Sequence, residues 1–225
     1  MFPLYEKPDA VVVVVDILRA TSSIITAFQN GVERLIPVRT IDEAKNYKDK
    51  GFLIAAERDG KVLDFADFGN SPDNFTPEKV KGHTIVYSTT NGTQAIQQAG
   101  HCAQVVIGGF LNISALEKHL INMDRDVIIL CAAWKDRFSL EDSVFAGFLA
   151  DRLLESGKFE TICDSAKAAR DLWIMARPDL LNYIDKVAQR TRLRELGLDN
   201  AIEYCHSIDI TDVIPVLENG SLRKI

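Results

Sequence analysis

The chain has 225 residues, 47% of them hydrophobic and 26% charged, and a formal net charge of −6. These proportions are typical of folded soluble domains, and the longest apolar run, 11–15, is too short to cross a bilayer. The negative charge and the absence of a dense basic tract make nucleic acid an unfavourable partner. Residues 1–10 lack the basic start and cleavage site of a signal peptide, so we expect an intracellular, cytoplasmic protein.

The four cysteines are scattered along the chain and form neither a Cys-x-x-Cys pair nor a Cys/His cluster. This spacing argues against structural zinc and against a disulfide framework. We expect buried free thiols at Cys102, Cys131, Cys163 and Cys205.

Three segments have the pattern of a βα unit, in which an apolar run is followed by a polar stretch and then by an amphipathic run. The apolar runs are 11–15, 84–87 and 126–131. The first contains only valine, which predicts a strand buried on both faces. The helices that follow are expected to end near Asn30-Gly31, Gly100 and Ser156-Gly157, because glycine is common at helix ends. The third helix is predicted to begin at Ser139, with Asp142 at the capping-box position.

Further elements are predicted between and after these units. A strand at 35–38, a helix at 41–50 and a strand at 52–56 lie between the first two units, and a buried strand at 105–107 precedes a helix that begins at Asn112. After about residue 160 the chain is mainly helical, with a last strand at 213–218. The sequence therefore predicts an α/β fold, a layered α/β/α arrangement with a mostly parallel or mixed sheet. We expect a single compact unit over residues 1–225, with any subdivision falling near 120–126.

Polar residues that follow the strands are the candidates for chemistry, because open α/β sheets bind ligands outside the carboxyl ends of their strands. Asp16 ends the valine strand and Arg19 follows it closely. A carboxylate and a guanidinium would then lie near one another, although a helix-capping aspartate with a structural arginine partner has the same pattern.

The stretch 88–93, Ser-Thr-Thr-Asn-Gly-Thr, combines hydroxyls, a glycine and backbone N–H groups at a helix start, as anion-binding loops do. An ordinary capped turn has a similar composition, and the stretch is not a Walker A motif. Glu141 and Asp142 are adjacent acids at another helix start, where they also favour the helix dipole. Together with Asp16 and Glu57 they offer the oxygen ligands that Mg²⁺ requires. Arg58 and Arg137, each beside a strand end, are candidates to bind a second anionic group.

Four motifs in this order resemble the 2-phosphosulfolactate phosphatase family. They are Val15-Asp-Ile-Leu-Arg-Ala-Thr-Ser-Ser23, Phe68-Gly-Asn-Ser-Pro72, Thr89-Thr-Asn-Gly-Thr93, and Phe138-Ser-Leu-Glu-Asp142 with Ala146-Gly147 after it. The resemblance is strong from about residue 10 to 155 and continues more loosely through Leu196-Gly197 and 209–215.

The resemblance implies a Mg²⁺-dependent phosphatase that cleaves 2-phospho-3-sulfolactate to sulfolactate and phosphate, a step associated with coenzyme M biosynthesis. The positions that match the family are Asp16, Arg19, Asn70, Ser71, Thr89, Thr90, Asn91, Gly92, Thr93, Glu141 and Asp142, and Glu57 and Arg58 fit a Glu-Arg pair. The chain departs from the family at Ala56, at Phe65-Ala66 and at 133–136, where Ala-Trp-Lys-Asp replaces a glycine-containing loop. The last departure would reshape the pocket for another phosphoester.

A mechanism follows from the resemblance as a hypothesis. Asp16 with Glu141 or Asp142 would hold Mg²⁺, which orients a water molecule for in-line attack. Arg19 and the loop 89–93 would hold the phosphate, and protonation of the leaving alkoxide would fall to Glu57 or to water. Arg58, Asn70 and Ser71, with Arg137 at the rim, would bind the sulfonate or carboxylate.

Two alternatives stay open at this point. Asp16 could be a nucleophile that forms an aspartyl-phosphate, although Leu18 stands where the Asp-x-Asp phosphatase motif has its second acid. The protein could also bind a small anionic metabolite without turning it over. A homodimer is expected only from the general frequency of such assemblies.

Overall fold

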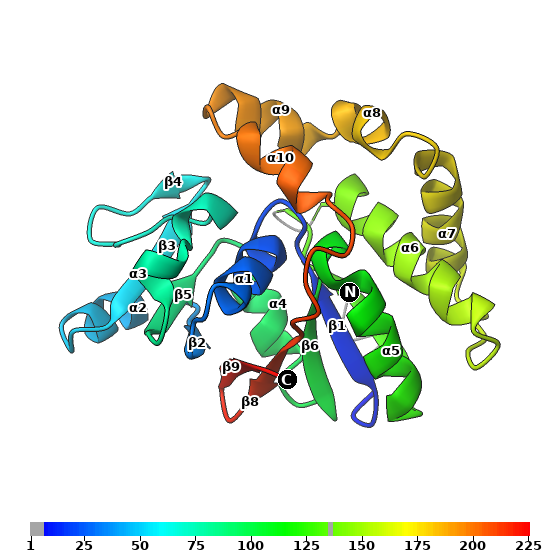
Figure 1. Ribbon diagram of the computed structural model, residues 1–225, viewed down its shortest axis with the longest axis horizontal. Helices are drawn as coiled ribbons and strands as arrows, with labels where there is room; N and C mark the ends of the chain where they lie inside the picture. Colours follow the sequence, from blue (N-terminus) through cyan, green and yellow to red (C-terminus); the bar gives the residue numbers. More distant parts are fainter. Residues whose placement is uncertain (1–6, 135–136) are drawn as a thin grey trace.

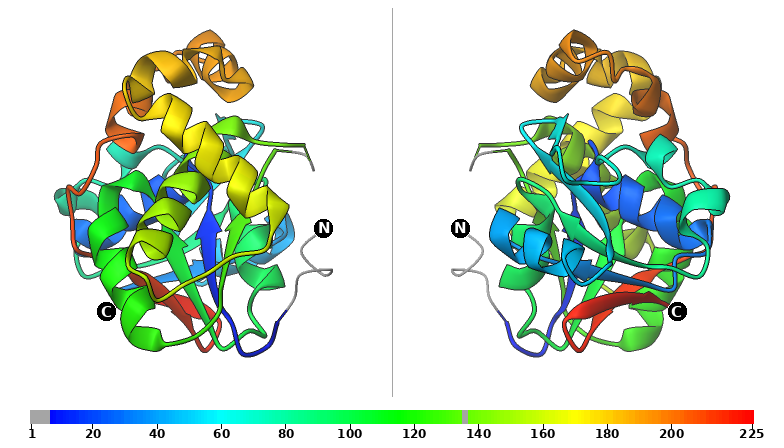
Figure 2. Two further views of the ribbon diagram at one scale, coloured as in Figure 1. Left: turned by 90° about the vertical axis from the view of Figure 1, so that its right-hand side faces the viewer. Right: turned by 90° about the vertical axis from the view of Figure 1, so that its left-hand side faces the viewer.

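The sheet is built from two groups of parallel strands that a C-terminal hairpin joins. The computed structural model describes residues 7–134 and 137–225, and in it helices cover both faces of one nine-stranded sheet (Figures 1 and 2). This confirms the predicted layered α/β fold with a mixed sheet. The strands are β1 (Val11–Val15), β2 (Arg34–Pro37), β3 (Leu53–Arg58), β4 (Lys61–Val62), β5 (Thr84–Ser88), β6 (Gln104–Gly108), β7 (Val127–Cys131), β8 (Pro215–Glu218) and β9 (Ser221–Lys224).

Apart from the β3–β4 hairpin, helices alternate with the strands up to β7, and the helices α6 to α10 then follow one another without a strand between them. They are α1 (Ala20–Gln29), α2 (Ile41–Lys48), α3 (Pro77–Val80), α4 (Gly92–Gln98), α5 (Ile113–Met123), α6 (Leu140–Glu155), α7 (Asp164–Ala176), α8 (Leu180–Tyr183), α9 (Ala188–Glu195) and α10 (Asn200–Cys205). Short 3-10 helices span 72–74, 110–112 and 184–186. Among the described residues, no helix has the length and apolar character needed to span a membrane.

The two parallel groups run in opposite senses. The strand order is β4-β3-β5-β2-β9-β8-β6-β1-β7, and the pairings β2–β9, β9–β8 and β8–β6 are all antiparallel. Five neighbouring pairs separate β1 from β5, so a twist of about 20–25° per pair rotates β5 by about 100–125° relative to β1. Because β5 also runs in the reverse sense, the two strand directions differ by only about 55–80°. The twist therefore allows the carboxyl ends of both groups to meet.

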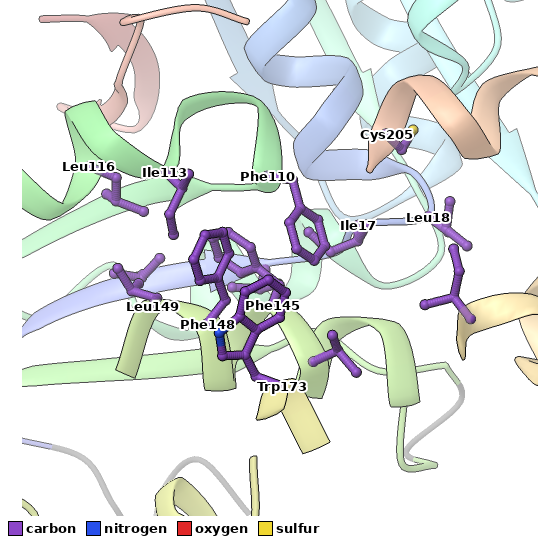
Figure 3. Packing of buried hydrophobic residues seen from close by; sticks show 14 of the residues in the cluster. Ile17, Leu18, Phe110, Ile113, Leu116, Phe145, Phe148, Leu149, Trp173 and Cys205 are labelled. Atoms are coloured by element: carbon purple, nitrogen blue, oxygen red, sulfur yellow. The ribbon is translucent and has the colours of Figure 1, made fainter. Parts of the chain in front are cut away.

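Strand β1 organises the core on both faces of the sheet. Its five valines are fully buried, as predicted. Val11, Val13 and Val15 pack in one cluster with residues of α5 and α6, while Val12 and Val14 pack in a second cluster with α1 and α4. Figure 3 shows the first cluster, in which Phe148 stacks on Trp173 with ring centroids 4.0 Å apart.

Helices α7 to α10 form a cap over the strand ends. Helix α7 packs along α6, and α8, α9 and α10 then cross above the carboxyl ends of the strands (Figures 1 and 2). Gly147 permits the contact between α6 and α7, since a Cβ at this position would lie 1.9 Å from the carbonyl oxygen of Ala169. The helix of the third βα unit, α6, is thus fixed to the cap.

Most predicted elements are present near their expected bounds, and the exceptions are short. Strands β4 and β9 were not predicted, because β4 has two residues and β9 depends on its hairpin with β8 through the turn at Asn219-Gly220. All four cysteines are free thiols, as expected, but only Cys205 is fully buried, and the other three are partly exposed.

Candidate active site

A small cavity lies where the carboxyl ends of β1, β3, β5 and β7 meet the cap. Its volume is about 30 Å³. Its walls come from four strand ends, the start of α6, and helix α9. The lining residues are Asp16, Leu18, Arg19, Glu57, Gly60, Asn70, Thr90, Asn91, Ala133, Trp134, Glu141, Asp142, Gln189, Arg192 and Leu193.

Asp16 joins the end of β1 to the start of α1. Its Oδ1 accepts a hydrogen bond from the backbone N–H of Ala20 at 3.3 Å, and its own N–H donates to Thr21 Oγ1 at 3.1 Å. The start of α4 lies directly against this turn. A Cβ at Gly92 would come within 2.6 Å of Ala20 Cβ and 3.1 Å of Asp16 Oδ2, so the glycine in the 88–93 loop is required for the approach of α4.

Asp142 connects the first and third βα units. Its Oδ1 accepts from the backbone N–H of Ile17 at 2.9 Å, and its Oδ2 accepts from Ala133 N at 3.4 Å. Ser139 caps α6 by accepting from Asp142 N at 3.4 Å, as predicted. Because the Asp142 carboxylate binds those two backbone groups, it holds the ends of β1 and β7 in register with the start of α6.

Burial and mutual repulsion disfavour the charged forms of three acids in the cavity. Burial raises the pKa of Asp16 well above its ordinary value, and the charge of Asp142 raises it further. The same two causes raise the pKa of Glu141 to about 8, and burial raises the pKa of Asp142 to about 6. A cation between these side chains would relieve both effects.

The acids fit the way in which Mg²⁺ usually binds. Within the described ranges, no three aspartate, glutamate, histidine or cysteine side chains form a ligand set for a metal by themselves. Mg²⁺ ordinarily takes one or two carboxylates and completes its shell with water and substrate phosphate oxygens. Asp16 and Glu141 match that pattern, and Asp142 is the third acid at the same wall.

Arg19 supplies a buried positive group at this wall. Its side chain is only 5% exposed, and its Nη1 has no hydrogen-bond partner among the described residues. Burial lowers the pKa of the guanidinium, while the nearby Cys205, Tyr87, Glu57 and Asp16 partly offset this effect. A buried polar group without a partner is costly, so an anion in the cavity would stabilise Arg19.

Glu57 fixes the 88–93 loop to the end of β3. Its Oε1 accepts from Thr90 N at 2.9 Å and from Thr90 Oγ1 at 3.1 Å, and its Oε2 accepts from Gly60 N at 2.6 Å. Asn70 also lines the cavity, and its Oδ1 accepts a hydrogen bond from the Tyr87 hydroxyl.

Several predicted site residues lie beside the cavity and do not line it. Thr93 N donates a hydrogen bond to Thr89 Oγ1 at 3.3 Å. This bond joins the two ends of the 89–93 segment. Arg58 donates to Ser88 Oγ at 2.9 Å and to Arg39 O at 3.2 Å. Ser71 is buried and Arg137 is exposed, and neither lines the cavity.

The cap contributes residues that sequence reasoning did not assign to the site. Gln189, Arg192 and Leu193 come from α9, and Trp134 comes from the loop after β7. The departure from the family at 133–136 was the available signal for Trp134, while Lys135 and Asp136 lie outside the described residues. No motif marked α9, whose place above the cavity depends on the packing of α7 against α6.

Comparison with known proteins identifies the family of this chain. The sequence model of the 2-phosphosulpholactate phosphatase family matches residues 2–220. A relative from Caldanaerobacter subterraneus subsp. tengcongensis named "Probable 2-phosphosulfolactate phosphatase" is 38% identical over 216 residues, covering 94% of this chain and 89% of its own length. A relative with the same name from Thermotoga maritima is 38% identical and covers 92% of this chain and 89% of its own length. Another, from Clostridium botulinum (strain Eklund 17B / Type B), is 33% identical and covers 96% of this chain and 92% of its own length. The chain therefore belongs to the 2-phosphosulpholactate phosphatase family, whose members are hydrolases of phosphate monoesters.

Proposed function

We propose that this phosphatase hydrolyses 2-phospho-3-sulfolactate to 3-sulfolactate and inorganic phosphate with the help of Mg²⁺. The observation that carries the proposal is the convergence of Asp16, Glu141 and Arg19 on one cavity, although 125 residues separate the first two. Burial disfavours the charged carboxylates of Asp16 and Glu141, and the buried Arg19 beside them has an Nη1 without a hydrogen-bond partner among the described residues. This combination suits a cation and a phosphoryl group bound side by side.

Asp16 and Glu141 would hold the metal, with Asp142 beside them. Mg²⁺ bound there would neutralise phosphoryl oxygens and increase the acidity of a water molecule. Asp142 keeps the three chain segments of this wall aligned through Ile17 N and Ala133 N. Alignment of this kind is what in-line attack on phosphorus requires.

Arg19 and the 88–93 loop would bind the phosphoryl group. The free Nη1 of Arg19 can donate to an equatorial oxygen as charge develops on it. Thr90 and Asn91 form the adjoining wall, and Glu57 keeps Thr90 in place. The reaction would take place in the cytoplasm, within sulfolactate metabolism such as coenzyme M biosynthesis.

Phosphate release from purified protein tests the proposal. We expect release from 2-phospho-3-sulfolactate that EDTA abolishes and that added Mg²⁺ restores, and little release from phosphoserine or glycerol 3-phosphate. No release from any small phosphorylated hydroxy acid would favour a protein that only binds an anionic metabolite. Trapping of a phosphorylated Asp16 by mass spectrometry would instead favour the aspartyl-phosphate route.

A further inference from the structure

We propose that Arg192 of the cap binds the second anionic group of the substrate, the sulfonate, and thereby selects it over phosphoesters that lack this group. The inference rests on the proposed function, because it assigns the part of the substrate that Asp16 and Arg19 do not hold. It concerns a residue from the C-terminal helices, outside the four motifs that carry the strong part of the family resemblance.

Arg192 is fixed at the cavity by neutral contacts. Its guanidinium lies over the Trp134 ring, 5.0 Å from the centroid, and its Nη1 donates to Gln189 Oε1 at 3.2 Å. Gln189 in turn donates from Nε2 to the backbone oxygen of Leu18 at 3.1 Å, which connects α9 to the segment that carries Arg19. A Cβ at Gly60 would stand 3.1 Å from Arg192 Nη2, so the glycine leaves room for this side chain.

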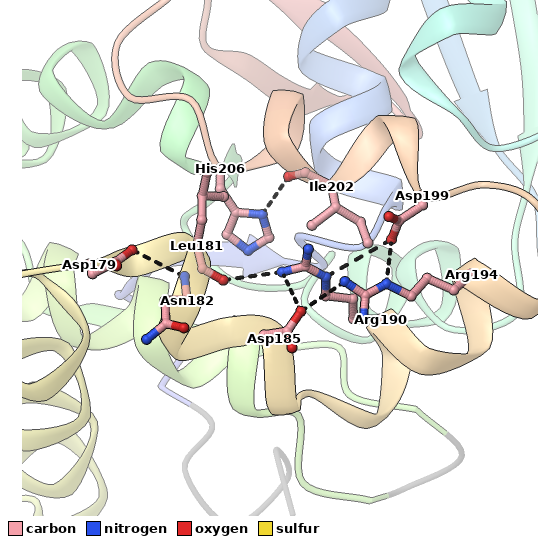
Figure 4. A network of polar contacts seen from close by, with 9 residues as sticks. All are labelled: Asp179, Leu181, Asn182, Asp185, Arg190, Arg194, Asp199, Ile202 and His206. Carbon is pink, nitrogen blue, oxygen red and sulfur yellow. Dashed lines mark hydrogen bonds and ion pairs between the residues drawn. The ribbon is translucent and has the colours of Figure 1, made fainter.

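The other arginines of α9 are neutralised, whereas Arg192 has no carboxylate partner among the described residues. Arg194 pairs with Asp185 at 2.8 Å and with Asp199 at 3.2 Å, and Arg190 pairs with Asp185 at 3.2 Å (Figure 4). These ion pairs hold the cap together. Arg192 lines the cavity instead and keeps its positive charge available there.

The chemistry of the two cavity arginines matches a substrate with two anionic ends. A guanidinium that lies over an indole ring can still donate hydrogen bonds to an oxyanion, here from the nitrogens other than the Nη1 that binds Gln189. Arg19 lies at the sheet end of the cavity, where the proposed metal acids also lie, and Arg192 belongs to the cap wall. Arg58, another cation near the strand ends, donates to Ser88 and to backbone oxygens and does not line the cavity.

Steady-state kinetics with two substrates test the assignment. For Arg192→Gln we expect kcat/KM for 2-phospho-3-sulfolactate to fall about 10- to 100-fold, the effect of losing charge-assisted hydrogen bonds. With 2-phospholactate, which lacks the sulfonate, we expect a change of less than about 3-fold. Arg192→Lys should recover part of the loss, and Arg177→Gln, at an exposed arginine where α7 ends and outside the cavity, is the control.

The outcomes separate this inference from the proposed function. An equal loss on both substrates, or no loss on either, would overturn the role of Arg192 in an enzyme that is active. If the wild-type protein releases no phosphate, the proposed function fails. The role of Arg192 can then still be tested by measuring the binding of 3-sulfolactate and of lactate by calorimetry in the presence of Mg²⁺. We expect Arg192→Gln to weaken 3-sulfolactate binding alone, and unchanged binding would contradict the assignment. Thermal unfolding of each variant establishes that the fold is intact.

Discussion

At the scale of single residues, Asp16 has a structural contact and a proposed chemical role in the same carboxylate. Its Oδ1 accepts from the N–H of Ala20, the first residue of α1, while its Oδ2 would lie 3.1 Å from a Cβ at Gly92. Both interpretations of the sequence, helix cap and site residue, are therefore compatible with the geometry. A substitution that keeps the cap and removes the charge separates them.

Asp16→Asn is that substitution. The amide oxygen of asparagine can still accept from Ala20 N and the disfavoured charge is removed, so we expect the melting temperature of the metal-free protein not to fall. Metal-dependent phosphate release should fall by about 100-fold or more, the scale of losing one group that stabilises transition-state charge. Asp64→Asn, at an exposed acid outside the cavity, is the control. Wild-type activity in Asp16→Asn would rule out the ligand role.

At the scale of elements, the junction of α6 with α7 positions both the metal acids and the cap. Gly147 lies on the helix that begins with Glu141 and Asp142, and a Cβ there would overlap the Ala169 backbone. Since backbone atoms cannot move aside as a flexible side chain can, we expect Gly147→Ala to destabilise the fold by about 3 kcal/mol.

Thermal unfolding measures this effect. A loss of about 3 kcal/mol corresponds to a fall in Tm of about 6–12 °C for a domain of this size. Gly100→Ala, whose nearest neighbouring atom would be 3.3 Å from the new Cβ, is the matched control and should change Tm far less. Equal Tm values for the two variants would mean that the helices separate easily.

The elements that local patterns encode were predictable, and those that depend on distant packing were not. The valines of β1, the Ser139 cap and the glycine stops are local signals, and each is present where the sequence placed it. The acids and Arg19 follow strand ends, so their meeting could be expected from the βα pattern. Arg192 carries no such signal, because only the crossing of α7 over α6 brings α9 to the cavity.

At the scale of the whole molecule, the site depends on a sheet whose two parallel groups run in opposite senses. In a uniformly parallel sheet all carboxyl ends lie at the same edge. Here the β8–β9 hairpin joins the two groups, and the twist that accumulates across the sheet brings their carboxyl ends together. The acids that meet in this way are buried together, so their protonation contributes to the stability of the entire fold.

The sign of that contribution gives a pH prediction. The pKa of Glu141 is raised to about 8 from a model-compound value of 4.5, so the folded chain holds more protons than the unfolded chain between those values, and raising the pH favours unfolding. We expect Tm of the metal-free protein to fall by about 4 °C from pH about 6.5 to about 8.5. This range avoids the buried His206, whose pKa is lowered to about 4. Scanning calorimetry with EDTA measures the effect, and Glu141→Gln should make the fall in Tm smaller, while Asp16, whose pKa burial also raises, continues to contribute. A Tm that rises with pH in the wild type would contradict the account.

The most direct test of the shared cation is to locate it. Crystals grown with Mn²⁺ in place of Mg²⁺ and measured at the manganese absorption edge should give one anomalous peak in contact with Asp16 and Glu141, close to Arg19. A peak at other residues with this cavity empty, or no peak at millimolar Mn²⁺, would contradict the claim that these acids and a phosphoryl group share a metal.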